Sequence, residues 1–291
     1  MVRQAHHDRK SLTLADRWIL SRLQGAARGV TKALEEYRFN EMARLLHQFL
    51  WGDFCDWYLE IAKLQREEPA LKPATERVLR LVLERVLRLL HPVMPFITEE
   101  LWQKVSGRGS SILLESWPQP QSEWEDPKAE SEFARLQAVI AEVRNIRATF
   151  RVPVKEKVGL LIQGSRGTEW LGPHEKTLQR LGSVGQVTAR MQGRRPAGSV
   201  VSHLPAGGGF VPWDLIVPLE GLVDLEKERR RIETEVEALQ QRARSKRQRL
   251  QDSDFRRNAP AEVVAQEEGS LKELEQELAK WAESLKQLEA G

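Results

Sequence analysis

Residues 242 to 257 carry a dense group of positive charges whose chemistry suits phosphate binding. Seven arginines and lysines stand there against two aspartates. They are Arg242, Arg244, Lys246, Arg247, Arg249, Arg256 and Arg257. Such side chains neutralise nucleic-acid phosphates and displace their counterions, so the segment is a candidate phosphate-binding surface. The alternative is internal pairing, because residues 262 to 289 contain eight glutamates that could face these cations.

These cations lie on one arm of an expected helical hairpin. Apolar residues recur at steps of three and four from Leu222 to Leu250 and again from Val264 to Leu288, which is the spacing of a coiled-coil seam. The loop between the two seams holds Asn258, Ala259 and Pro260, and so short a connection favours antiparallel helices packed on each other. At a rise of ~1.5 Å per residue each arm would be about 40 Å long. Such an arm can reach a partner but cannot enclose a reaction.

Motifs for catalysis or metal binding were sought and are missing. The glycines at 207–209 precede neither a helix start nor a lysine, which predicts a turn rather than a phosphate loop. The six histidines show no metal-ligand spacing beyond the pair at 6 and 7. Cys55 is the only cysteine, so neither a disulfide within the chain nor a thiolate metal site is expected. We therefore expect no metal and no cofactor in this chain.

The overall composition narrows the class of protein. Lysine and arginine outnumber aspartate and glutamate by 45 to 42, a mild basic bias that is compatible with nucleic acid. Two smaller sets of cations, Arg17 with Arg22 and Arg38, and the run from 144 to 151, could belong to the same binding face. No window approaches the ~18 uncharged apolar residues of a membrane span, and the first ten residues lack a signal-peptide core. A cytoplasmic protein without membrane contact is expected.

The N-terminal third reads as a helical bundle. Apolar residues recur at helical spacing through most of residues 12–101. Thr13 and Asp16 form a capping-box pattern, Pro92 should stop a helix that ends at His91, and another helix should start near Pro95. Glycine, serine and proline then accumulate over residues 106–127, with two tryptophans as anchoring points, which predicts a linker.

In the middle of the chain, the spacing of the apolar residues changes from helical to strand-like in several segments. A helix is expected over 129–150 and another over 169–181, and short strands are expected over 155–163, 184–191, 199–204 and 213–219. This pattern predicts a small α/β module. The fold is thus mainly α, with three parts: a helical bundle at 11–115, a linker with the α/β module at 116–220, and the antiparallel coiled-coil hairpin at 221–291.

An aromatic run at residues 49–58 could offer rings for base stacking. Core packing is the stronger interpretation, because Leu46, Leu50, Trp57 and Ile61 fit one buried helix face. Only Trp51 or Tyr58 is left as a candidate exposed ring. Neighbouring carboxylates such as Glu99 and Glu100 are interpreted as a solvated helix face.

Several strings resemble the class I aminoacyl-tRNA synthetases. Four are similar to the helical anticodon-binding domain of that family: 15–23 (ADRWILSRL), 37–41 (YRFNE), 53–58 (DFCDWY) and 90–102 (LHPVMPFITEELW), the last being the most specific. Others resemble the valyl branch and its C-terminal coiled-coil arm: 144–147 (RNIR), 152–153 (VP), 219–228 (LEGLVDLEKE), Phe255 and 259–264 (APAEVV). The resemblance runs from about residue 12 to the end.

The resemblance implies a tRNA-binding segment, most of all for tRNA(Val), with no DNA partner. In that family the bundle reads the anticodon and the hairpin leans against the outer corner of the tRNA. The matching strings imply four candidates near the anticodon: Arg17, Arg22, Arg38 and Asn40. The candidates for the tRNA elbow are Arg242, Lys246, Arg247, Arg249, Arg256 and Arg257. The segment would support the ATP-dependent attachment of valine to tRNA(Val).

The sequence also departs from the family. The His-Ile-Gly-His and Lys-Met-Ser-Lys-Ser signatures are absent, as is any segment long enough for a catalytic or editing domain. We expect no catalytic site in this chain, and ATP would be used by a catalytic domain outside it. Two alternatives stay open: a protein-interaction scaffold that docks through the hairpin, and a separately encoded half that complements a catalytic synthetase body. Steep salt dependence would separate phosphate binding from apolar docking.

Overall fold

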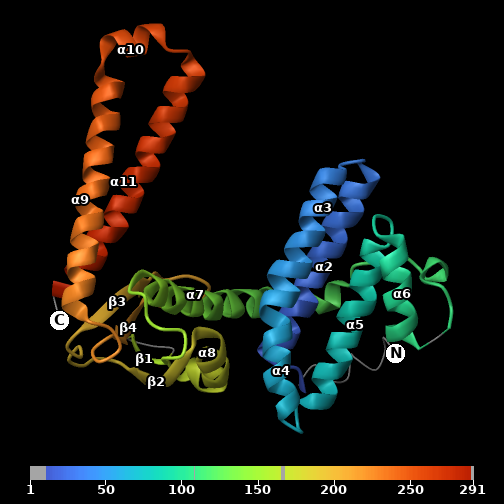
Figure 1. Ribbon diagram of the computed structural model, residues 1–291. Helices are drawn as coiled ribbons and strands as arrows, with labels where there is room; N and C mark the ends of the chain where they lie inside the picture. The colour runs from blue at the N-terminus through green and yellow to red at the C-terminus, as the bar shows by residue number, and fades with distance from the viewer. Residues whose placement is uncertain (1–10, 108, 165–167, 290–291) are drawn as a thin grey trace. The chain divides into compact units, whose positions relative to one another are not determined.

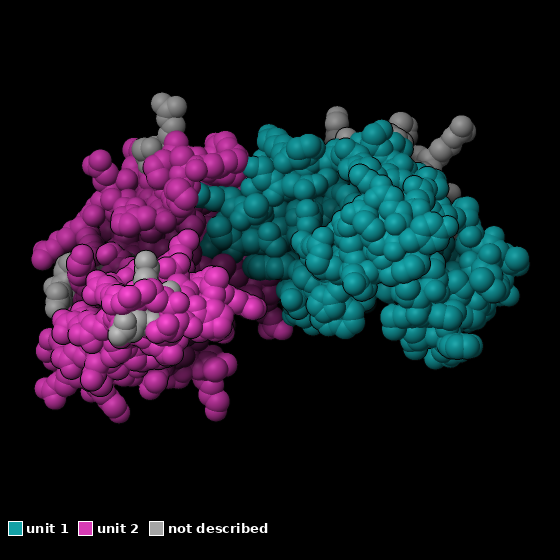
Figure 2. Space-filling model, turned by 90° about the horizontal axis from the view of Figure 1, so that it is seen from above, with its two compact units in different colours: residues 1–138 teal, residues 139–291 magenta. Residues whose placement is uncertain are grey.

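The computed structural model describes residues 11–107, 109–164 and 168–289. The chain forms two compact units, residues 1–138 and 139–291, which are described separately (Figures 1 and 2). The expected fold class is confirmed: the chain is mainly helical, with one small four-stranded sheet and two long C-terminal helices paired as a hairpin. The division into three parts at 115 and 220 stays a prediction.

The first unit is an up-and-down bundle of helices (Figure 1). Its elements are α2 (Leu14–Glu35), α3 (Phe39–His47), the π-helical segment η2 (Gln48–Leu59), α4 (Glu60–Glu67), α5 (Lys72–Leu90) and α6 (Pro95–Ser106). The segments α3, η2 and α4 follow one another without a break, so they act as one long helical rod that packs beside α2 and α5. A π-helical stretch of this length inside a helix is rare, and nothing in the apolar spacing predicted it.

The start of α2 is fixed by the capping box that the sequence predicted. The hydroxyl of Thr13 accepts a hydrogen bond from the backbone N–H of Asp16 at 3.2 Å, and Oδ2 of Asp16 accepts one from the backbone N–H of Thr13 at 3.0 Å. These two bonds satisfy N–H groups that the first helical turn leaves without partners. The expected helix end before Pro92 and the new start at Pro95 are also confirmed, by the ends of α5 and α6.

The segment after α6 is tied down by its tryptophans, as expected. It contains two short 3-10 turns, η3 (Ile112–Leu114) and η4 (Ser122–Trp124), before α7 (Pro127–Thr149) begins. The indole N–H of Trp117 donates to the hydroxyl of Thr31 at 2.8 Å, and the buried ring of Trp124 lies under the guanidinium of Arg85. The chain thus returns to α2 and α5 before it enters α7.

The second unit is built around the sheet. The strands are β1 (Val158–Gln163), β2 (Val184–Arg190), β3 (Ser199–Leu204) and β4 (Trp213–Pro218), in the order β2-β1-β4-β3. β1 and β2 are parallel and are joined through η5 (Thr168–His174) and α8 (Glu175–Gly182), whereas β4 runs antiparallel to both of its neighbours. All four predicted strands and the expected α/β module are therefore present. The glycines at 207–209 form a turn closed by a bridge between Gly207 and Phe210.

The C-terminal hairpin consists of α9 (Leu225–Gln251) and α11 (Ala261–Glu289), with the short helix α10 (Ser253–Asn258) at its tip (Figure 1). Asp224 caps α9 by accepting from the backbone N–H of Lys227 at 3.0 Å. The predicted seam is buried on α9 at Ile232, Val236, Leu239, Ala243 and Leu250, and on α11 at Leu274. The predicted turn at 258–260 precedes the start of α11, but α10, which interrupts the tip after the end of α9 at Gln251, was not predicted.

The aromatic run at 49–58 is core, as predicted, with one correction. Phe49, Phe54 and Tyr58 are buried, and Tyr58 has no exposed surface at all. Its hydroxyl donates to Oδ1 of Asp16 at 2.6 Å, which satisfies the polar tip inside the bundle. Tyr58 was therefore wrongly left as a candidate exposed ring. Trp51 is the exposed one at 54%, with its ring stacked on His47 at 5.3 Å between centroids.

Candidate nucleic-acid interface

The distal half of α9 presents cations to solvent. Arg242 and Arg244 are exposed, and no ion pair to either guanidinium occurs among the residues that the structure describes. Ala243 lies between them in the buried seam, so the packing of α9 on α11 turns the two guanidinium groups outward. Among the phosphate-binding candidates on α9, these two are the ones without an ion pair in the described part of the chain.

Three other candidates on α9 pair across the hairpin. Lys246 and Arg249 both bind the carboxylate of Glu267 on α11, and Arg247 binds Glu275. The lysine's hydrogen bond holds the pKa of the Glu267 carboxyl below its usual value. The alternative of internal pairing is therefore present in the structure for these three residues. Surface ion pairs contribute little to stability, because water and salt screen both partners, so an incoming phosphate can compete for the same cations.

The tip of the hairpin adds an aromatic contact. The guanidinium of Arg249 lies over the ring of Phe255, 4.7 Å from its centroid, and this stacking attaches α10 to the end of α9. Arg257 donates to the backbone carbonyl of Ser253 at 3.2 Å, one turn earlier in α10. The side chain of Arg256, another elbow candidate, lies outside the described part of the structure.

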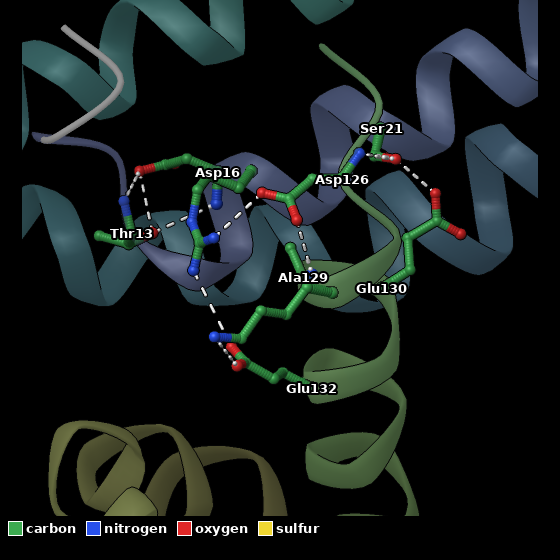
Figure 3. A network of polar contacts seen from close by, with 9 residues as sticks. Thr13, Asp16, Ser21, Asp126, Ala129, Glu130 and Glu132 are labelled. Atoms are coloured by element: carbon green, nitrogen blue, oxygen red, sulfur yellow. Dashed lines mark hydrogen bonds and ion pairs between the residues drawn. The ribbon is translucent and has the colours of Figure 1, made fainter. Parts of the chain in front are cut away.

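In the bundle, two of the four anticodon candidates are held by carboxylates, and Figure 3 labels Asp126 and Glu132, the two carboxylates that bind the first candidate. Arg17 pairs with Asp126 at 3.0 Å and approaches Glu132 at 3.9 Å. Arg22 pairs with Asp53 at 2.9 Å and approaches Glu130 at 3.6 Å. These contacts tie the first turns of α2 to η2 and to the start of α7, while burial raises the pKa of Asp53 against the opposing effect of Arg22. Arg17 and Arg22 thus lie close together and brace the bundle.

The other two candidates lie at the opposite end of α2. Arg38 pairs with Glu36 at 2.6 Å and with Glu41, and Asn40 is exposed in the first turn of α3. Twenty-one residues of mostly helical chain separate Arg38 from Arg17, which corresponds to ~30 Å along the bundle. The structure therefore does not bring the four candidates together. Arg17 and Arg22 lie near the start of α2, whereas Arg38 and Asn40 lie beyond its C-terminal end.

The basic run at 144–151 has a structural use. The side chain of Arg144 donates to the carbonyl of Leu181 at 2.8 Å, and that of Arg147 donates to the carbonyls of Ser183 and Pro153 at 3.4 and 3.1 Å. The first two carbonyls lie at the C-terminal end of α8, where helix carbonyls lack intrahelical partners. These arginines cap α8 and join it to the C-terminal part of α7 within the second unit.

The sequence did not predict the structural role of one arginine at the base of the hairpin. Arg231 donates to the carbonyl of Thr149 at 2.6 Å, pairs with Glu228 at 2.7 Å, and lies 5.3 Å from the ring centroid of Trp281. It therefore connects the base of α9 to the end of α7 and to α11. Its partners Thr149 and Trp281 lie 82 and 50 residues away in the sequence, so no local pattern could have indicated this role.

Residues 11–107, 109–164 and 168–289 also bear on metal binding and on membrane insertion. No group of three or more histidine, cysteine, aspartate or glutamate side chains among these residues is arranged to hold a metal ion. In the same ranges, the helices are too short or too polar to cross a lipid bilayer.

Two protein-family models match this chain, one over the bundle and one over the hairpin. Residues 16–162 match the anticodon-binding domain of tRNA ligase. This match covers the bundle, α7 and most of β1, about half of the chain, and the chain therefore belongs to the family of anticodon-binding domains of tRNA ligases. Residues 224–289 match the valyl tRNA synthetase tRNA binding arm, which spans the hairpin from its N-cap onward. Within its class, the chain corresponds to the C-terminal anticodon-binding domain and tRNA-binding arm of valyl-tRNA synthetases.

The similar curated proteins are valine–tRNA ligases. The valine–tRNA ligase of Thermotoga maritima is 38% identical over 282 residues, which are 96% of this chain and 31% of that protein. The valine–tRNA ligase of Geobacter sulfurreducens is 39% identical over 91% of this chain and 30% of its own length. That of Geobacillus stearothermophilus is 36% identical over 88% and 29%. The chain thus spans less than a third of the length of these relatives.

Proposed function

We propose that this chain is the tRNA-binding part of a valine–tRNA ligase and positions tRNA(Val) for the attachment of valine. The bundle meets the anticodon, the hairpin meets the elbow, and both act in the cytoplasm. The chemistry, with its use of ATP, takes place in a catalytic body outside this chain. The observation that carries the proposal is the pair Arg242 and Arg244, two exposed guanidinium groups on an arm whose family model is a tRNA-binding arm.

The remaining elbow candidates support the same surface. Lys246, Arg247 and Arg249 exchange Glu267 and Glu275 for phosphate oxygens when RNA arrives, because each pair is partly solvated. A phosphate carries its own charge to the site, so the exchange keeps each cation paired. Arg256 and Arg257, at the tip, extend the surface beyond the end of α9.

For the anticodon we propose Arg38 and Asn40 as direct contacts. Arg38 lies in the exposed turn before α3 and Asn40 in the first turn of α3, and an amide can hydrogen-bond a base edge while a guanidinium meets phosphate. Arg17 and Arg22 contribute by holding the first turns of α2 in place, through the carboxylates that they bind.

Binding to tRNA(Val) and to a non-cognate tRNA at several salt concentrations tests the proposal. The variant Arg242→Glu/Arg244→Glu should bind tRNA(Val) at least about ten-fold more weakly and show a shallower salt slope, by about 1 per arginine removed from a phosphate. The control Arg180→Glu/Arg194→Glu makes the same change of charge at two exposed positions of the second unit outside the hairpin. It should bind as the wild-type chain does.

Each outcome has a definite meaning. Salt-sensitive binding that prefers tRNA(Val) and is lost only in the hairpin variant supports the proposal. Equal weakening in both variants would mean that net charge alone drives association. No binding at low salt would overturn an autonomous tRNA-binding part and favour the protein-interaction scaffold. Restored valylation on mixing with a catalytic body, without tRNA binding by the chain alone, would favour a complementing half.

A further inference from the structure

One arginine of the basic run at 144–151 has no structural use of the kind that Arg144 and Arg147 have. The side chain of Arg151 is exposed, and it forms no ion pair or hydrogen bond within the ranges that the structure describes. It stands at the start of the loop that joins α7 to β1, residues 151–157, which we call the α7–β1 loop. Neither burial nor pairing explains why a cation occupies this position.

The backbone of Arg151 has a conformation that favours glycine. Its φ is +49°, in the left-handed region. The N–H of Val152 donates to the carbonyl of Arg147 at 2.9 Å, and the N–H of Arg151 donates to the carbonyl of Ala148 at 3.3 Å. These are the two hydrogen bonds of a Schellman motif, in which the left-handed residue is usually glycine because a Cβ there costs energy. The chain therefore carries an arginine where glycine would suit the helix end better.

The same loop presents two more cations. Lys155 and Lys157 are exposed, and neither pairs with a carboxylate in the described part of the chain. Glu156 is the only acidic residue of the loop. The shape of the loop is fixed at its turn, where the carbonyl of Pro153 accepts from the N–H of Glu156 at 3.0 Å and from the guanidinium of Arg147 at 3.1 Å. The loop is thus a basic surface with a defined backbone.

The α7–β1 loop starts at the base of the hairpin, on the side of α9 that carries Arg242. Arg231 donates to the carbonyl of Thr149, which holds the end of α7 against α9 (Figure 1). Arg242 follows Arg231 by eleven residues, which is about three helical turns, so both side chains leave α9 in nearly the same direction, ~16 Å apart along the axis. One nucleic-acid strand spans that distance in about five nucleotides, at ~3.4 Å of axis per phosphate.

We infer that Arg151, Lys155 and Lys157 form a second phosphate-binding site, which holds the RNA backbone at the base of the arm. The inference deepens the proposed function and rests on it, because the RNA is the one that Arg242 meets. Cations without internal partners bind phosphates without first leaving a carboxylate. Phosphate contacts carry no sequence information, so this site adds affinity for any tRNA and fixes where the arm stands on it. Strain at a functional position is the expected compromise between stability and binding.

The variant Arg151→Gly separates a binding role from a structural one. Glycine relaxes the left-handed conformation, so the Tm should equal that of the wild-type chain or exceed it by up to about 3 °C. The affinity for tRNA(Val) should fall about three-fold or more, with a salt slope shallower by about 0.9. Ser183→Gly is the matched control, because Ser183 also has a positive φ, 53°, in the second unit. It should leave tRNA binding unchanged.

The variant Lys155→Gln/Lys157→Gln tests the other half of the site. It should weaken the binding of tRNA(Val) and of a non-cognate tRNA to the same degree, about five-fold at low salt, because the contacts are to phosphates. The control Arg180→Gln/Arg194→Gln removes the same charge from two exposed positions of the second unit. It should bind both tRNAs as the wild-type chain does.

The outcomes distinguish this inference from the proposed function. If Arg242→Glu/Arg244→Glu weakens tRNA binding and the loop variants do not, the inference is overturned, the proposed function stands, and an acidic protein surface becomes the better partner for the loop. Equal weakening by the loop variants and their charge control would mean that net charge alone acts, which also overturns the inference. A lowered Tm with unchanged affinity in Arg151→Gly would assign this arginine to folding. If no variant of the hairpin or the loop weakens binding, both proposals fail.

Discussion

The hydroxyl of Tyr58 donates a hydrogen bond to the carboxylate of Asp16, and neither side chain has any exposed surface. The second carboxylate oxygen of Asp16 accepts from the backbone N–H and the hydroxyl of Thr13, at 3.0 and 2.9 Å. Gln65 donates to the Thr13 hydroxyl at 2.6 Å and accepts from Thr75 at 3.0 Å. One buried polar chain therefore connects η2, the start of α2, α4 and α5.

Tyr58→Phe should destabilise the bundle by about 1–3 kcal/mol, because it leaves a buried carboxylate oxygen without its donor while keeping the ring. The free energy of unfolding from urea titration measures the effect. Tyr37→Phe is the matched control, since Tyr37 is 79% exposed, and it should stay within about 0.5 kcal/mol of wild type. Equal stability of the two variants would show that the Asp16 contact contributes nothing.

The same aspartate makes stability depend on pH. Burial raises the pKa of Asp16 in the folded chain above its ordinary value of 3.8, although the hydrogen bonds from Tyr58 and Thr13 oppose the shift. The folded state therefore holds this proton more tightly than the unfolded state does, and stability from this group falls as pH rises from about 4 through the folded pKa. In Asp16→Asn this titration disappears.

Urea titrations of wild type and Asp16→Asn between about pH 4 and pH 7 check that sign. The free energy of unfolding of wild type minus that of the variant should decrease as pH rises. A difference that increases with pH would mean that hydrogen bonding outweighs burial at this carboxylate, so that its pKa is lowered on folding.

Glu267→Gln should strengthen tRNA binding. The substitution removes the shared anionic partner of Lys246 and Arg249 while keeping the shape of the side chain, so both cations become available without an exchange. A gain of a few-fold in affinity at low salt is expected, with little change in the free energy of unfolding, because exposed ion pairs contribute little to it. Glu262→Gln, an exposed position with no ion pair among the described residues, is the control. Weaker binding in Glu267→Gln would show that the carboxylate orients the cations for RNA.

Arg231→Ala should loosen the base of the hairpin. It removes the donor to the Thr149 carbonyl and leaves the buried carboxylate of Glu228 without its counter-charge, a loss of about 2–3 kcal/mol. Hydrogen exchange of α9 and α11 near the sheet should become faster. The neighbouring Arg230→Ala, at an exposed position, should change neither quantity. If both variants behave alike, the contact of Arg231 with the end of α7 has no stabilising role.

The sequence allowed the regular parts of this fold to be predicted for clear physical reasons. Heptad spacing needs only local counting, and it located the buried seam from Ile232 to Leu250. Capping boxes and proline stops also act within four residues, and they identified the start of α2 and the end of α5 correctly. Alternation of apolar residues found all four strands.

Contacts between distant segments could not be predicted in this way. Arg17 meets Asp126 across 109 residues, and Lys246 meets Glu267 across the hairpin turn. A cation in a sequence looks the same whether its partner is an internal carboxylate or a phosphate, so the candidate site contained residues of both kinds. Arg242 and Arg244 became distinct from Lys246, Arg247 and Arg249 only when α9 and α11 were placed side by side.

The ion pairs across the hairpin also affect the net number of ions released on RNA binding, which is measured from the salt dependence of the affinity. In the complex that we propose, Lys246, Arg247 and Arg249 bind phosphates, so Glu267 and Glu275 lose their partners and take up cations from the solution. That uptake offsets part of the counterion release from the RNA. The salt dependence of complex formation will therefore report fewer phosphate contacts than the arm makes. Replacing both glutamates by glutamine should make the number of phosphate contacts obtained from the salt dependence equal to the number that the arm makes.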